Sequence, residues 1–172
     1  MNNEALQTQI ALLHNGDKVA FEELYQDLKT PVYTIIFRIL YDRVLAEDIM
    51  QDVFLRLFHS PPDSQVQNPR AYIFRMARNL AIDSKRKPVQ AALTDEIGNT
   101  GGSPEEAIIL RLDIESKLRE LSSDAREIIT LHVNGELKFR EIAEILNIPL
   151  GTILWKYQKA LSCLRSKLTG GE

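Results

Sequence analysis

The chain has 172 residues, of which 44% are hydrophobic and 26% charged, with a formal net charge of −3. This composition supports a packed core in one domain or two small ones. It excludes a membrane-spanning class, because the longest apolar stretch is interrupted by Arg38 and is too short to cross a bilayer. The N-terminus lacks a secretory pattern and Cys163 is the single cysteine, so a reducing, cytoplasmic location is expected.

Charge is strongly segregated along the chain. Residues 1–69 carry a net −5, residues 70–88 a net +5, residues 89–137 a net −6, and residues 138–172 a net +3. Two basic islands in an acidic chain predict two contacts with a polyanion, and acidic surface remains for other partners. Ordinary solvated helix faces are the alternative interpretation.

Helical periodicity runs through nearly the whole sequence, and no stretch alternates as a strand. The pattern predicts helices over 3–14, 17–28, 31–41, 44–58, 69–86, 104–120, 123–133, 138–146 and 150–168. Pro31 is expected to open the third helix at its first turn. The prolines between Ser60 and Pro69 predict a loop.

A composition change from Pro88 to Pro104, rich in glycine and proline, predicts a linker. The predicted fold class is therefore all-α, with two small helical domains joined by a flexible linker. The expected boundaries are 1–88 for the first domain, 89–104 for the linker and 105–170 for the second domain.

The helix AEDIMQDVFLRLF (46–58) is apolar nearly all round except for one stripe. Asp48, Gln51, Asp52 and Leu55 follow the i, i+3, i+4, i+7 spacing and share a face. An acidic and amide stripe on an otherwise buried helix predicts a docking site for another protein. The alternative is that the stripe is only the solvated face that such a helix needs.

The basic island NPRAYIFRMARNLAIDSKRK (68–87) places cations, aromatic rings and an amide on one helix. Cations hold phosphates, whereas aromatic and amide side chains contact unpaired bases, so the pattern is compatible with single-stranded DNA. The candidate residues are Arg70, Tyr72, Arg75, Arg78, Asn79, Lys85 and Arg86. Tyr72 and its neighbour Phe74 are alternatively core residues.

The segment EIAEILNIPLGTILWKYQKAL (141–161) has the spacing of a helix-turn-helix. Asn147 tolerates the left-handed conformation at the turn, and Gly151 and Thr152 leave backbone N–H groups for phosphate. At 100° per residue, Leu154 falls at the border of the buried face and Trp155 falls opposite the core. Trp155 is interpreted as a contact to DNA, an anchor for a protein, or a packed side chain.

The chemistry of an enzyme is absent from the sequence. The histidines His14, His59 and His132 lie far apart, and no metal-ligand spacing, phosphate-binding glycine loop or nucleophile motif occurs. The sequence therefore predicts no catalytic residue, metal, cofactor or small-molecule substrate.

Together these motifs resemble the extracytoplasmic-function (ECF) group of bacterial RNA polymerase sigma factors. AEDIMQDVFLRLF is similar to the polymerase-binding helix of the sigma-2 domain, and NPRAYIFRMARNLAIDSKRK to the helix that melts and reads the −10 element. LKFREIAEILNIPLGTI is similar to the sigma-4 helix-turn-helix that reads the −35 element. The resemblance covers nearly the whole chain.

This resemblance implies roles for particular residues. The stripe Asp48, Gln51, Asp52 and Leu55 would contact the clamp helices of the polymerase's largest subunit, and the basic helix would contact −10 DNA. Arg140, Gly151, Thr152, Trp155, Lys156 and Lys159 would lie at the −35 element. The resemblance also implies contact with the flap of the second-largest subunit and binding of an anti-sigma protein.

Two positions depart from the family pattern, because Leu154 and Leu161 stand where basic residues are usual. Two alternatives are a stand-alone helix-turn-helix regulator and a sigma-like polymerase-binding protein that reads DNA weakly. A stand-alone regulator is expected to dimerise on spaced half-sites, and no separate dimerisation segment is visible.

Overall fold

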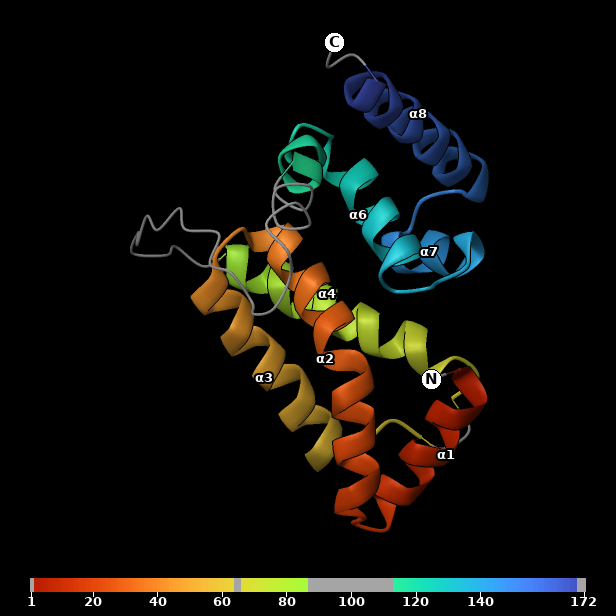
Figure 1. Ribbon diagram of the computed structural model, residues 1–172. Coiled ribbons are helices and arrows are strands. Elements are labelled where there is room, and N and C mark those ends of the chain that lie inside the picture. Colours follow the sequence, from red (N-terminus) through yellow and green to blue (C-terminus); the bar gives the residue numbers. More distant parts are fainter. Residues whose placement is uncertain (1, 64–65, 87–112, 170–172) are drawn as a thin grey trace.

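The computed structural model describes residues 2–63, 66–86 and 113–169, whose regular structure is entirely helical (Figure 1). The helices are α1 (Asn3–His14), α2 (Lys18–Leu40), α3 (Arg43–His59), α4 (Pro69–Arg86), α6 (Ser123–Val133), α7 (Phe139–Leu146) and α8 (Leu150–Thr169). Residues 113–119 are also helical. The all-α prediction is confirmed, while the predicted linker 89–104 lies outside the described residues.

The prediction of two helices over 17–28 and 31–41 is wrong, because α2 runs unbroken from Lys18 to Leu40 with Pro31 inside it. Proline within a helix removes a backbone hydrogen bond and costs about 3 kcal/mol. Burial offsets this cost, since Leu28 and Val32 on either side of Pro31 are both fully buried. The core thus overrides the local signal for a break.

Side chains and left-handed residues define where several helices begin and end. The Asp17 carboxylate accepts from the backbone N–H groups of Val19 and Ala20 at the start of α2. At the end of α2, Tyr41 adopts φ 54°, and Asn147 adopts the same φ at the end of α7. The left-handed turn predicted at Asn147 is confirmed.

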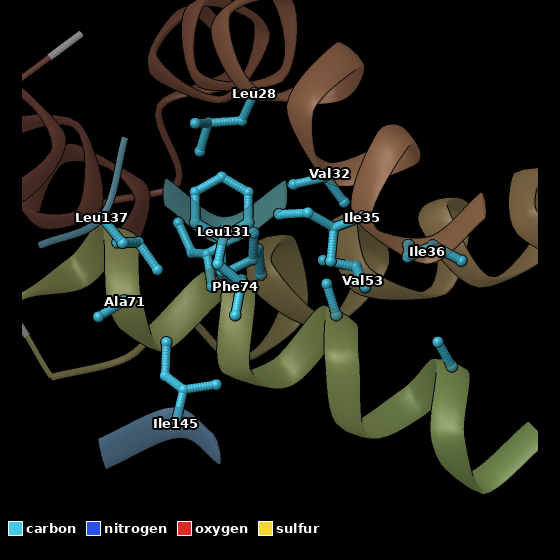
Figure 2. Close-up of a cluster of buried hydrophobic side chains, with 14 of the residues drawn as sticks. Leu28, Val32, Ile35, Ile36, Val53, Ala71, Phe74, Leu131, Leu137 and Ile145 are labelled. Carbon is cyan, nitrogen blue, oxygen red and sulfur yellow. The ribbon is translucent and has the colours of Figure 1, made fainter. Parts of the chain in front are cut away.

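Helix α2 is the central element, packing against α1, α3, α4 and α6 (Figure 1). One buried apolar cluster joins the N-terminal helices to the C-terminal segment, residues 113–169. Phe74 on α4 is fully buried in this cluster, close to Leu28 of α2 and to Leu131 of α6 (Figure 2). The two segments therefore share a core.

The turn between α6 and α7 closes this shared core from the C-terminal side. Leu137 in this turn is 1% exposed, and Glu136 before it has φ 54°, which is uncommon for a residue with a Cβ. A Cβ at Gly135 would lie 2.5 Å from the Leu131 carbonyl oxygen, so the turn requires glycine at that position.

A smaller buried cluster belongs to the C-terminal segment alone. It joins Leu118 and Leu121 to Ala125 and Ile129 of α6 and Ala160 of α8. Helix α8 packs against α6 and α7 and lies away from α3 (Figure 1). Across the described ranges, none of the helices combines the length and the apolar character that crossing a membrane requires.

Candidate functional site

The predicted docking stripe on α3 lies wholly on the surface. Asp48, Gln51, Asp52 and Leu55 are all exposed, and Leu55 keeps 53% of its accessible surface. Ala46, Val53 and Leu57 on the opposite side are fully buried. The α2 and α4 helices cover that side. The exposed side of α3 also carries Val44, Glu47 and Arg56, so the stripe lies within a broader exposed face.

Helix α4 is positioned at its N-terminus by Asn68, whose side-chain oxygen accepts from the Ala71 N–H at 2.9 Å. The preceding loop is held by helix α1, because Gln7 donates to the Val66 carbonyl and the His14 ring nitrogen lies 2.8 Å from the Pro62 carbonyl oxygen. Helix α1 and Asn68 of the loop thus fix the start of the basic helix.

The candidate DNA-binding residues on α4 divide between two faces. Tyr72, Arg75, Asn79, Lys85 and Arg86 are exposed. The Lys85 ammonium also donates to the Ile39 carbonyl at 3.3 Å. Tyr72 is therefore a surface residue, whereas Phe74 belongs to the core, which resolves the two alternatives that the sequence left open.

The other two candidates, Arg70 and Arg78, face the C-terminal segment. The Arg70 side chain is 8% exposed; its Nε donates to the Gly135 carbonyl at 2.7 Å and it pairs with Glu136 at 3.1 Å. Arg78 Nε lies 2.6 Å from a carboxylate oxygen of Glu127 on α6, with both side chains about four-fifths buried. These two cations are bound within the protein itself.

The helix-turn-helix presents its predicted residues on the outer side of α8. Gly151, Trp155 and Lys159 are exposed, with 60% of Trp155 accessible, and Thr152 is half-buried. The Lys159 ammonium lies 4.9 Å from the centre of the Trp155 ring, a cation–π contact. Arg140 on α7 is exposed as well.

Two further residues of α8 lie next to this exposed face. Leu154, expected at the border of the packed face, is 40% exposed and adds apolar surface next to Trp155. Lys156 forms an ion pair with Asp124 of α6, so its charge is partly compensated. The exposed face of α8 therefore combines the Trp155 ring and Leu154 with the Lys159 ammonium.

A polar seam between α2 and the C-terminal segment was missed by the sequence interpretation. The Arg38 guanidinium pairs with Glu115 at 3.1 Å and donates to Asn134 at 2.8 Å. Tyr41 lies against Arg119 and Arg126, with guanidinium-to-ring distances of 4.3 and 5.0 Å. Burial raises the pKa of the Tyr41 phenol.

Within the ranges that the structure describes, no three His, Cys, Asp or Glu side chains gather into a possible metal site. Three exposed faces lie on α3, α4 and α8. Each combines charge with an aromatic or aliphatic side chain, as protein and nucleic-acid interfaces do.

Two family models match the chain in the order of these surfaces. The model of sigma-70 region 2 matches residues 24–89, which include α3 and α4. The model of sigma-70 region 4 matches residues 111–164, which include α6, α7 and most of α8. The class is thus that of the sigma-70 proteins, which bind RNA polymerase and promoter DNA.

Similar proteins show to which group of sigma-70 proteins the chain belongs. The chain is 29% identical to the ECF RNA polymerase sigma factor SigW of Bacillus subtilis, over 95% of this chain and 96% of SigW. It belongs to the ECF group of RNA polymerase sigma factors, proteins that direct transcription initiation and are not enzymes.

Solved structures share the arrangement of the helices. CnrH in complex with the cytosolic domain of CnrY matches 98% of this chain and 99% of its own, with a TM-score of 0.68 and 19% identity. RpoE of Bartonella quintana, in complex with the anti-sigma factor NepR, matches 88% of this chain and 98% of its own, with a TM-score of 0.69 and 21% identity.

Proposed function

We propose that the α3 stripe of Asp48, Gln51, Asp52 and Leu55 binds the clamp helices of the polymerase's largest subunit. The observation that supports this assignment is the exposure of all four side chains on a helix whose opposite side packs against α2 and α4. Two carboxylates and an amide accept hydrogen bonds from a basic partner, and Leu55 adds apolar contact.

The DNA contacts are assigned to two helices. The exposed face of α4, with Tyr72, Arg75 and Asn79, would hold the separated strands of the −10 element through phosphate contacts and stacking. The predicted contacts to the −10 element also include Arg70, Arg78, Lys85 and Arg86. On the second domain, Arg140, Gly151, Thr152, Trp155, Lys156 and Lys159 would lie at the −35 element.

The proposed domains are residues 1–88 and 105–170, with a linker over 89–104. The match to sigma-70 region 2 ends one residue past the proposed first domain, and the match to region 4 lies inside the proposed second domain. The protein would act in the cytoplasm, where its polymerase is. The second domain would also contact the flap of the second-largest subunit.

An anti-sigma protein is a further proposed partner. A groove of about 790 Å³ lies between α2, α3 and residues 113–119, with Tyr33, Phe37 and Met50 as its apolar lining and Gln51 at its edge. A regulator bound there would contact both segments and would cover one end of the polymerase-binding stripe.

Trp155→Ala is expected to weaken transcription that depends on the −35 element. The ring is 60% exposed and Lys159 lies over it, so its loss removes an apolar contact to DNA and frees that ammonium. We expect about a tenfold loss, equal to about 1.4 kcal/mol. The measurement is run-off transcription with purified core polymerase on promoters with an intact and a scrambled −35 element.

The control for this variant is the affinity for core polymerase, which should be unchanged because α8 lies far along the chain from the α3 stripe. Gln158→Ala, at an exposed position of the same helix, is the matched substitution. An unchanged response of Trp155→Ala to the −35 element would assign the tryptophan to a regulator instead.

A further inference from the structure

Helix α1 carries a line of polar side chains that faces the α3–α4 connection, whose described residues are 60–63 and 66–68. The residues of this line are Asn3, Gln7 and His14. At about 100° per residue, the three positions fall within about 40° of one another around the helix, so they share a face. The adjacent face of α1 is apolar, and its Leu6 and Ile10 are fully buried. Helix α1 is therefore anchored in the core beside the start of α4 (Figure 1).

Two side chains of this line donate to carbonyl groups of the connection. Gln7 Nε2 donates to the Val66 carbonyl at 2.9 Å. His14 Nε2 lies 2.8 Å from the Pro62 carbonyl oxygen, and it is the donor because a carbonyl oxygen can only accept. The connection thus has two of its main-chain acceptors occupied by one helix, as backbone groups outside regular structure require.

The same line continues to the start of α4. The Asn3 side-chain oxygen accepts from the Arg70 N–H at 3.3 Å. Residues 3, 7 and 14 of α1 therefore bond to residues 70, 66 and 62, in reverse chain order, so α1 and the connection run antiparallel. Within the connection, the Val66 N–H donates to the Asp63 carbonyl at 2.9 Å and closes a turn.

All three hydrogen bonds end on main-chain atoms of the connection and of α4. They fix the path of the chain without using the side chains of the connection, and Ser60, Asp63 and Gln67 there are exposed. The connection ends at Asn68, whose side chain caps α4. Its path therefore sets where α4 begins and how the exposed Tyr72 in the first turn of α4 is presented.

We propose that Gln7 and His14 are positioning residues for recognition of the −10 element, acting through the main chain of the connection. This inference rests on the proposed role of α4 at that element. Side chains that discriminate between bases must be held to within about 0.5 Å, and ordering them in advance removes a cost of binding. Loss of the two donors therefore reduces discrimination at the −10 element and leaves the α3 stripe intact.

Hydrogen exchange of the Val66 amide, followed by NMR in the free full-length protein, tests whether α1 holds the connection. Gln7→Met/His14→Phe keeps the approximate size of both side chains and removes both donors. His14 is exposed and Gln7 half-buried, so the variant leaves the core intact. We expect the Val66 amide to exchange about tenfold faster, because the turn that it closes opens more often.

Run-off transcription with purified core polymerase tests the consequence for recognition. The template is a promoter that the wild-type protein transcribes, compared with derivatives that carry one substituted base in the −10 element or a scrambled −35 element. We expect Gln7→Met/His14→Phe to lower the ratio of transcript between the intact and the −10-substituted promoter about tenfold, and to leave the −35 ratio unchanged. A variant that is merely less stable reduces transcription from all templates alike, so neither ratio changes.

Gln9→Met is the matched control on the same helix. Gln9 Nε2 donates at 2.6 Å to Glu23 of α2, so this variant removes a donor that does not face the connection. It should keep the wild-type exchange of Val66 and the wild-type −10 ratio. His14→Gln replaces the ring N–H by an amide N–H of similar reach and should also retain the wild-type ratio.

Unchanged exchange of Val66 in Gln7→Met/His14→Phe would overturn the bracing by α1. Faster exchange with an unchanged −10 ratio, or an equal fall of the −10 and −35 ratios, would overturn the positioning role. A failure of the proposed function is distinct, because it appears as the absence of promoter-dependent transcription by the wild-type protein. The exchange of Val66 in the free protein tests the bracing in that case as well.

Discussion

Phe74→Ala should lower the free energy of unfolding by about 3–5 kcal/mol, the range for removing a buried aromatic ring. Phe74 is fully buried where α4 meets α2 and the C-terminal segment, so truncation leaves a cavity that neither side can fill without moving the other (Figure 2). The measurement is urea-induced unfolding followed by circular dichroism.

Tyr72→Ala is the matched control for this prediction. Tyr72 is an aromatic residue on the same helix, two positions away and 40% exposed, so its truncation should cost about 0.5 kcal/mol. Equal losses for the two variants would contradict the packing of α4 described above.

Asp48→Arg/Asp52→Arg should weaken binding to core polymerase by at least about tenfold while leaving the fold intact. Both carboxylates are exposed on the α3 stripe, so the substitution does not disturb the core. Reversing two charges replaces attraction to a basic surface by repulsion, which also slows association. The affinity for purified core enzyme is measured by fluorescence anisotropy at physiological and at high salt.

A charge-matched control separates this effect from the change of net charge. Glu22→Arg/Glu144→Arg reverses two exposed carboxylates, one on α2 and one on α7, away from the stripe. This control should bind core polymerase as the wild type does. If both double variants lose the same affinity, α3 is not the polymerase-binding element.

Local sequence signals predicted most of the helices because each local preference agrees with the final packing. The stripe on α3 and the exposure of Trp155 follow from helical periodicity, which the structure retains in both helices. Asn147 was predictable for a similar reason, since few residue types adopt the left-handed conformation at a tight turn.

The break expected at Pro31 shows where local reasoning fails. The cost of the proline is local, whereas the burial of Leu28 and Val32 depends on helices that are distant in sequence. The cost of the proline can be read from the sequence, whereas the burial of Leu28 and Val32 is known only from the three-dimensional packing.

The contacts between α4 and the C-terminal segment could not be predicted from the sequence either. Nothing in the spacing of Glu127 and Glu136 indicates that they meet the arginines of α4, because the two groups are about 50 to 70 residues apart in the chain. One local signal was present: Phe74 lies on the same helical face as Arg70 and Arg78, and a ring between two cations on one face favours a buried interface.

The most direct test of promoter recognition by this protein is run-off transcription with purified core polymerase, using a library of genomic fragments as template. We expect transcripts that appear only when the protein is added and that start at a fixed distance downstream of a shared pair of −35 and −10 elements. Absence of any such promoter-dependent transcript, with the protein folded and bound to core enzyme, would contradict it.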